Sequence, residues 1–342
     1  MSRPHHANPD LRVRSDKPFL FCLGLLAGVY ILLIVLMVLA DIAYMFVDPD
    51  QENMPVMSRN VGIVEIIPQG AGHLVTVRDP KTGAGEDYAI RADQRLYVES
   101  GDRVKKGDLL TNGEMTGTQA MYRALVSPEI RYAIVLSLVS CTISTILSLW
   151  VAIPIGYLMS RFNFRGKAIF DTILDIPIVL PPLVVGISLL VLFNFPPFSW
   201  TSAYVVYEIP AVIIAQFMVA AAFAVRTLRV TFDRIPQRYE NVALTLGCNR
   251  ARAFWMVIMP QARYGVLAAG TLAWARALGE FGPILVFAGS TRMRTEVLPT
   301  SVFLEMQAGS LKGMLAISLL MIFTAAVVLM VARLFGMKKG DL

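Results

Sequence analysis

Six long apolar runs with few or no charges recur along the chain, from Phe19 to Ala332. Each is close to the length of about 20 residues that a helix needs to cross a bilayer. Charged residues make up 16% of the chain, compared with roughly 25% in globular proteins, and the mean hydropathy is +0.59. This pattern predicts an α-helical polytopic membrane protein and excludes a soluble enzyme, a secreted disulfide scaffold and a disordered protein. The six expected transmembrane helices are Phe19–Ala40, Tyr132–Met159, Ile176–Phe198, Ile209–Val225, Gly265–Phe287 and Gly313–Ala332.

The distribution of lysine and arginine predicts how these helices are oriented. The four segments that we expect inside carry 17 basic residues, whereas the two short loops that we expect outside carry three. Because cytoplasmic loops are enriched in Lys and Arg, we expect a multi-pass protein of the cytoplasmic (inner) membrane with both termini in the cytoplasm. The 17 basic residues on the expected cytoplasmic face account for the net charge of +6, so no nucleic-acid partner is expected. The inside segments are 1–18, 160–168, 226–263 and 333–342, and the outside loops are 194–208 and 289–312.

The chain divides into three parts. Residues 1–47 form the cytoplasmic N-terminus and an uncleaved first anchor, residues 48–129 form a translocated insertion, and residues 130–342 form a five-helix core. The insertion has nine basic and thirteen acidic residues, and β-rich stretches divided by turn residues predict a small all-β extracytoplasmic domain. Two roles remain open for this domain: it docks a partner, or it is an inert insertion. The expected strands are Val61–Ile67, Leu74–Val77, Tyr88–Ile90 and Leu96–Val98.

A stretch between the fourth and fifth spans, Tyr239 to Pro260, has the pattern of two short amphipathic helices. Apolar residues recur at i, i+3, i+4 and i+7 on each side of Gly247. Gly247 can end the first helix in a left-handed conformation, and Pro260 is expected to mark the turn back into the membrane. On spacing alone, a helix pair lying on the membrane surface is the alternative. The apolar positions are Tyr239, Val242, Ala243 and Leu246, then Ala251, Phe254, Trp255 and Ile258.

This stretch resembles the EAA loop of ABC-importer permeases, a Glu/Ala-rich turn followed by Gly and then I-x-L-P. Here Val242 and Ala243 precede Gly247, and Val257-Ile258-Met259-Pro260 closes the motif. The resemblance implies that the segment docks as a coupling helix into a groove on a separate ATPase subunit. The residues that it assigns to ATPase coupling are Glu240, Ala243, Leu246, Gly247, Val257 and Pro260.

Two further stretches resemble the molybdate, tungstate and sulfate branch of type I ABC importer permeases. One is Ile176 to Gly186, similar to P-x-V-L-P-P-x-x-x-G, and the other is Ala277 to Gly282, similar to A-L-G-E-F-G. Prolines within a span free backbone carbonyls, which membranes tolerate only against neighbouring helices or a water-filled path. The same prolines are equally compatible with a helix kink that serves packing alone. The expected pathway or gating residues are Pro177, Pro181, Pro182, Gly186, Arg276, Gly279 and Glu280.

Arg276 and Glu280 stand four residues apart, so they are expected to pair on one helix face. Ionisable groups inside a membrane are costly unless they pair or face a cavity. Since a carboxylate repels an oxyanion, a structural or gating ion pair is favoured over direct contact with the substrate.

The resemblance implies the permease subunit of an importer for a tetraoxyanion: molybdate, tungstate or sulfate. It also implies a second copy of the chain, two ATPase subunits and an extracytoplasmic binding protein as partners. An ABC importer permease for another solute (phosphate, a polyamine or iron) is the alternative. The chain has no P-loop motif and no recognisable metal or catalytic motif, so we do not expect it to be an enzyme or to hold a cofactor. ATP and Mg²⁺ are expected to bind to the separate ATPase subunit. A signalling or scaffold protein is a third hypothesis.

Overall fold

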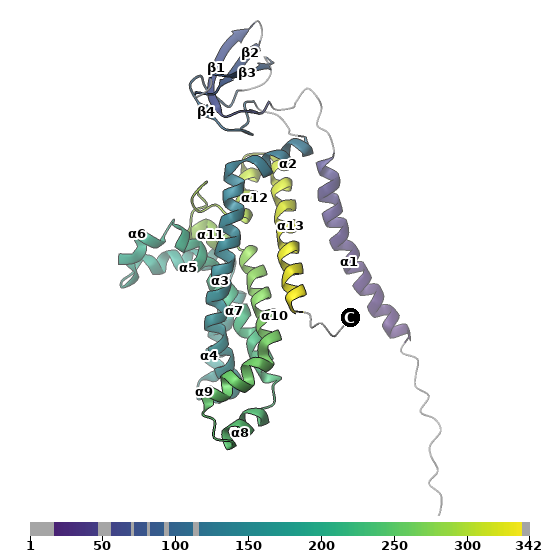
Figure 1. Cartoon of the computed structure of the whole chain (residues 1–342), viewed down its shortest axis with the longest axis vertical. Coiled ribbons are helices and arrows are strands. Elements are labelled where there is room, and N and C mark those ends of the chain that lie inside the picture. Colours follow the sequence, from purple (N-terminus) through teal and green to yellow (C-terminus); the bar gives the residue numbers. More distant parts are fainter. Residues whose placement is uncertain are drawn as a thin grey trace, which may run out of the picture.

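The computed structural model describes residues 17–46, 56–69, 72–80, 83–91, 96–111 and 116–336. The terminal basic segments used in the orientation argument lie largely outside these ranges. A small sheet and helix α2 (Gly117–Val126) lie at one end of a long helical body, which we call the sheet end (Figure 1). Helices α8 (Arg238–Thr245) and α9 (Arg250–Ala253) lie at the opposite end, which we call the α8 end.

Four described helices are long and apolar enough to cross a membrane. The bent pair α4 (Lys167–Val179) and α5 (Pro182–Asn194) makes a fifth if it counts as one span. Six spans therefore remain a prediction, because α10 (Met259–Leu278), which covers most of the fifth expected span, is not among these helices. The four helices are α1 (Lys17–Met45), α3 (Pro128–Arg161), α7 (Ile209–Asp233) and α13 (Leu311–Gly336).

The expected helix Ile176–Phe198 is not one helix. It begins in the last turn of α4 and continues in α5, and the chain bends by 111° between these two helices. Leu180, which separates them, is extended (φ −64°, ψ 138°), because a residue before proline avoids the helical region. Pro182 then opens α5 at a position where no backbone donor is needed. Two adjacent prolines thus convert an apolar run into a sharp corner.

The core of the helical body lies where α3 packs against α7 and α10. Small side chains allow these helices to approach closely, and Ala152, Ala220, Ala224, Ala269 and Ala273 are all fully buried. A Cβ atom added to Gly156 of α3 would lie 3.1 Å from the backbone nitrogen of Arg229 on α7. The α3–α7 pair therefore forms the firm support from which both ends extend.

The chain does not turn at Pro260. Helical residues run without a break from Arg250 through a π turn (Phe254–Ile258) into α10. Pro260 lies in the first turn of α10, where the missing N–H of a proline is tolerated, and the π turn directly precedes this helix. The expected span Gly265–Phe287 is also divided, because α10 ends at Leu278 and a separate helix, α11, covers Gly282–Phe287. The remaining helical elements are the 3₁₀ turn Phe198–Thr201, α6 (Ser202–Val205) and α12 (Leu298–Gln307).

The sheet has four antiparallel strands in the order β3-β2-β1-β4. One face of the sheet buries a compact set of valines. Two of them, Val64 of β1 and Val77 of β2, lie opposite each other on neighbouring strands. The expected strand Leu96–Val98 is absent from the described sheet: Leu96 makes only an isolated bridge to Thr111, since β4 occupies the place beside β1. The strands are β1 (Gly62–Gln69), β2 (Gly72–Arg78), β3 (Gly85–Ile90) and β4 (Arg103–Val104).

Residues 48–129 are not entirely β. Helix α2 follows the sheet, and its first turn is closed by a capping box in which Thr116 and Gln119 satisfy each other's backbone N–H groups. The helical body then begins with α3 at Pro128. The T-x-x-Q pattern before an apolar run signals such a helix start, so the sequence contained this information.

Candidate functional site

The turn after α8 has the conformation that the sequence predicts. Gly247 has φ of 89°, and its N–H donates to the carbonyl of Leu244 at 3.0 Å. The N–H of Cys248 donates to the carbonyl of Ala243, also at 3.0 Å. These two bonds form a Schellman motif, which ends a helix through a left-handed residue. A Cβ at position 247 would meet nothing within 4 Å, so the requirement for glycine comes from the backbone conformation alone.

Helix α8 is anchored to the end of α3 through a buried carboxylate. The Tyr157 hydroxyl donates to Glu240 Oε1 at 2.6 Å, and Arg161 Nε lies 3.6 Å from Glu240 Oε2. A second Arg161 nitrogen donates to the carbonyl of Ile235 at 2.8 Å. Glu240 and Ala243 therefore face the helical body, where both are buried. Neither side chain therefore belongs to the exposed surface of α8.

Sequence reasoning did not single out Tyr157 as a site residue. Its ring packs edge-on against Phe254 at 4.7 Å and Phe232 at 5.8 Å, measured between ring centroids. The π turn and the end of α7 thus meet the same side chain that holds Glu240. The sequence signal that could have identified Tyr157 is its place near the end of an apolar run, where its hydroxyl needs a hydrogen-bond partner.

The apolar face of α8 is turned outward. Val242 is 57% exposed and Leu246 is 80% exposed, and Trp255 on the π turn is 65% exposed. The prediction that Ala243 shares a face with these residues is wrong, because Ala243 packs inward. Of the remaining predicted residues, Val257 is half-buried and Pro260 is exposed. The α8 end therefore buries the carboxylate of Glu240 while it exposes several large apolar side chains, which an ordinary surface helix would turn inward.

The structure brings together the two motifs that the sequence placed about a hundred residues apart. Helices α5 and α11 pack through a glycine on each side. A Cβ on Gly186 would lie 2.9 Å from Pro283 Cα, and one on Gly282 would lie 3.0 Å from Pro182 Cβ and from the Leu183 nitrogen. Such distances forbid a larger residue without movement of the backbone, so the corner at Pro181-Pro182 is locked against α11.

Pro177 and Gly279, two further residues predicted to line the pathway or act in gating, are less constrained. Pro177 lies inside α4 and takes away the donor that would reach the carbonyl of Ile173, a half-exposed residue. Gly279 caps α10 with an ordinary right-handed φ of −82°. A Cβ there would be 3.8 Å from its closest neighbours, so nothing in the structure requires glycine at this position.

Arg276 and Glu280 form the ion pair that their spacing predicts. Arg276 Nη2 lies 2.8 Å from Glu280 Oε1, although Glu280 follows the last residue of α10. The Glu280 side chain is 1% exposed and that of Arg276 is 32% exposed. The guanidinium also lies 5.6 Å from the centre of the Phe223 ring of α7, within the range of a cation–π contact.

A second group of charges, which sequence reasoning missed, fastens the sheet end. Glu305 of α12 is buried and pairs with Arg123 of α2 at 3.4 Å and with Arg292 at 3.2 Å. Lys105, just after β4, donates to Glu129 of α3 at 2.7 Å. This hydrogen bond to the carboxylate raises the pKa of the Lys105 ammonium. The charges come from distant parts of the chain, so no local spacing could reveal them.

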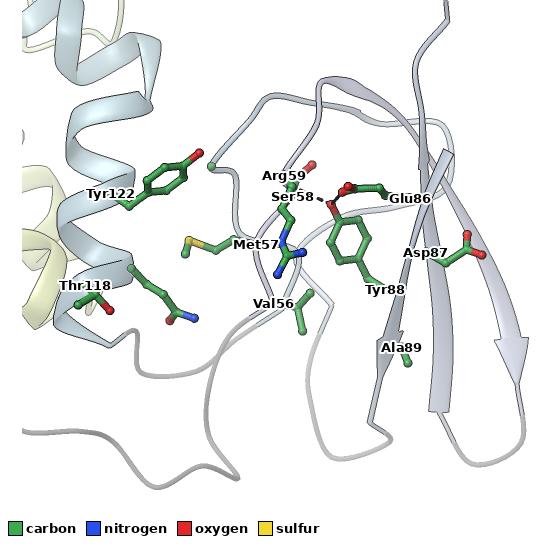
Figure 2. A pocket seen from close by; sticks show the side chains of 12 residues that line it. Val56, Met57, Ser58, Arg59, Glu86, Asp87, Tyr88, Ala89, Thr118 and Tyr122 are labelled. Carbon is green, nitrogen blue, oxygen red and sulfur yellow. Dashed lines mark hydrogen bonds between the residues drawn. The ribbon is translucent and has the colours of Figure 1, made fainter. Parts of the chain in front are cut away.

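A cavity of about 730 Å³ lies between the sheet and α2 (Figure 2). Tyr122 stands on one side, and Tyr88 on the other is fixed because its hydroxyl donates to Glu86 at 2.6 Å and accepts from the Arg59 backbone at 2.8 Å. The wall carries the Glu86 carboxylate and the Arg59 guanidinium, whereas the Asp87 carboxylate points away from the cavity and accepts a hydrogen bond from Thr76 at 2.7 Å (Figure 2). One carboxylate beside one guanidinium leaves no excess of positive charge for the capture of a free oxyanion.

Residues 152–337, more than half of the chain, match the family described as binding-protein-dependent transport system inner membrane component. The chain belongs to this family. The matched region contains both the α8 end and the α5–α11 contact, whereas the sheet precedes it.

Individual members of the family show where the similarity lies. The molybdate/tungstate transport system permease protein WtpB of Pyrococcus furiosus is 35% identical over 170 residues, which cover 50% of this chain and 65% of WtpB. The molybdenum transport system permease protein ModB of Escherichia coli K12 is 29% identical over 61% of this chain and 94% of ModB. The sulfate transport system permease protein CysT of the same organism is 27% identical over 59% of this chain and 78% of CysT. The match with WtpB thus spans a little less than two thirds of that relative.

A solved structure shares the fold. The permease fold of a bacterial ABC transporter involved in the import of the acidic polysaccharide alginate matches with a TM-score of 0.53, at 17% identity, over 64% of this chain and 82% of that chain. The helical body is therefore an ABC importer permease fold of type I.

Proposed function

We propose that this chain is the permease subunit of an ATP-driven importer that moves a tetraoxyanion (molybdate, tungstate or sulfate) across the cytoplasmic membrane. The molybdate, tungstate and sulfate permeases among the relatives support the substrate class, and the P-x-V-L-P-P and A-L-G-E-F-G elements that meet at the α5–α11 contact support the same branch. ATP hydrolysis is assigned to a separate ATPase subunit, since the sequence has no P-loop motif.

The observation that carries this proposal is the exposed apolar surface of α8 and the π turn. Val242, Leu246 and Trp255 need a partner, because large apolar groups gathered on one surface mark interaction sites. We assign them to a groove on the ATPase, which an amphipathic helix would fill. Glu240, Tyr157 and Arg161 then transmit movement of α8 to α3. In this arrangement the α8 end and both termini lie in the cytoplasm, and six segments enter the membrane.

A second copy of the chain would cover the exposed face of α5. Leu183, Ile187 and Val191 recur every four residues and are each about half exposed, so they form one stripe along the helix. In the proposed homodimer this stripe lies near the two-fold axis, and the α4–α5 corner lines the pathway. The Arg276–Glu280 pair then acts in gating or support, without contact to the anion.

The sheet lies outside the cytoplasm in this orientation, where a substrate-binding protein would dock. The ion pairs at Lys105 and Glu305 would connect such a docking event to α3 and α12. This role remains a proposal beside that of an inert insertion.

The substrate is tested by uptake in a strain that lacks this chain and its relatives. Reintroduced protein should restore accumulation of labelled molybdate, tungstate or sulfate only together with its ATPase. Excess of the unlabelled true substrate should abolish the signal. Restored uptake of phosphate, a polyamine or iron, without uptake of any of the three oxyanions, would show that the chain transports a different solute.

A further inference from the structure

An apolar groove lies between α3 and the helical turns that follow α8. Its volume is about 570 Å³, within the range of about 300–1,000 Å³ that is typical of small-molecule sites. Five aromatic rings line it, and among the described residues of its wall Arg250 is the one charged side chain. The groove borders the predicted docking surface, with which it shares Trp255, and it shares no lining residue with the α4–α5 corner. The lining residues are Trp150, Ile153, Pro154, Tyr157, Leu158, Phe162, Arg250, Ala251, Phe254 and Trp255.

The groove has the length and position of a lipid chain at the membrane boundary. On α3 it extends from Trp150 to Phe162, which at 1.5 Å per residue is about 18 Å along the helix. Trp150 is 75% exposed and lies within the membrane-crossing helix, while Phe162 directly follows its end. One end of the groove is therefore expected in the hydrocarbon region and the other at the headgroups.

The headgroup end is positive. The Arg250 guanidinium lies 5.3 Å from the centre of the Phe162 ring, and Arg252 on the same short helix is exposed. Arg161 is already engaged by Glu240 and by the carbonyl of Ile235. A guanidinium stacked on an aromatic ring keeps its donors in a planar fork that suits a phosphate. The groove thus combines an apolar channel with an anion-binding rim.

We propose that this groove binds an anionic phospholipid, with an acyl chain against Trp150 and Leu158 and the phosphate on Arg250. The lipid would touch Tyr157 and Phe254, the rings that position Glu240. It would thereby stabilise α8 in the orientation needed for docking. The location at the inner headgroup level and this effect on coupling rest on the proposed function, whereas lipid binding itself does not depend on transport.

Lipid retention by the purified full-length chain tests the proposal directly. Native mass spectrometry after exchange into mixed phosphatidylglycerol and phosphatidylcholine should show preferential retention of phosphatidylglycerol. Arg250→Gln should lower this retention about fivefold, since one basic residue near an anionic surface contributes about 1 kcal/mol. Arg263→Gln is the matched control, because Arg263 lines a different apolar groove between α3, α10 and α13, and its retention should equal that of the wild type.

Two further variants keep the test decisive. Ala251→Phe fills the groove from an exposed position and should lower phosphatidylglycerol retention without loss of the folded protein. A photoreactive residue at Leu158 should cross-link to phospholipid. Equal retention of both lipids, wild-type retention by Arg250→Gln and Ala251→Phe, or cross-linking to a second copy of the chain would each overturn the proposal. None of these measurements uses ATP or a substrate, so a failed uptake assay leaves their meaning unchanged.

Discussion

The two ends of the helical body hold their outer elements by charged contacts that differ in their shielding from water. At the α8 end the paired side chains of Arg161 and Glu240 are 6% and 10% exposed. At the sheet end the Lys105 side chain, paired with Glu129, is 50% exposed. Interactions between charges weaken as water and salt gain access. The α8 end is therefore built as a firm extension of α3, whereas the Lys105–Glu129 contact of the sheet end is one that solution conditions can loosen.

Removal of the shielded carboxylate should have the largest effect. Glu240→Ala leaves Arg161 without its buried partner, and such a loss costs about 3–5 kcal/mol. We expect uptake to be abolished and hydrogen exchange in α8 to become rapid, while the chain still inserts in the membrane. Glu86→Gln is the control, since Glu86 also accepts a tyrosine hydrogen bond of 2.6 Å, but at the sheet end. If Glu240→Ala transported normally, α8 would not depend on this anchor.

The next largest effect is expected at the turn after α8. A residue other than glycine in the left-handed region costs about 1–2 kcal/mol, and β-branched residues tolerate it least. Gly247→Val should therefore uncouple ATP hydrolysis from uptake, whereas Gly247→Asn should retain most activity because Asn adopts this conformation more readily. Equal activity of the two variants would show that the left-handed turn is not required.

The Arg276–Glu280 pair gives an intermediate and non-additive effect. Arg276→Ala and Glu280→Ala each leave one charge without its partner, so each single variant should lose more than half of what the double variant loses in uptake or assembly. A double-mutant cycle measures this coupling. Strictly additive losses would show that the two residues act independently, although Arg276 Nη2 and Glu280 Oε1 lie 2.8 Å apart.

The smallest effect is expected at the exposed contact of the sheet end. Lys105→Met removes the bond to Glu129, and a partly exposed ion pair contributes at most about 1 kcal/mol. Hydrogen exchange at residues 103–108 should rise modestly in the variant, and added salt should produce a similar rise in the wild type alone. Salt-independent exchange in the wild type would mean that the sheet is held by other contacts.

The sequence was sufficient for features that depend on local patterns. The left-handed Gly247, the spacing of Arg276 and Glu280, and the helical class of the chain follow from residue types and their periods. Hydropathy alone misjudged Ile176–Phe198, because it does not register that two adjacent prolines impose a corner. It also gave no sign that the π turn would carry the helix through Pro260.

The orientation of side chains at the site required the structure. The spacing of Ala243 placed it with Val242 and Leu246, but the choice between inward and outward faces depends on what α3 and α7 offer. Here Tyr157 and Arg161 attract the carboxylate of Glu240, so the charged side of α8 turns inward. Likewise, the contact between Gly186 and Gly282 depends on how α5 and α11 pack, which no local period encodes.

Docking of an ATPase subunit on the exposed apolar surface of α8 can be measured by copurification of that subunit with a Leu246→Asp variant. Leu246 is 80% exposed, so the substitution should leave the chain folded and in the membrane. Tyr204→Asp, at a residue that is 79% exposed on α6, is the matched control. We expect Leu246→Asp to lower the amount of copurified ATPase about tenfold or more, which corresponds to at least about 1.4 kcal/mol, while Tyr204→Asp retains it. Retention of the ATPase by Leu246→Asp at the wild-type level would show that this surface does not dock the ATPase.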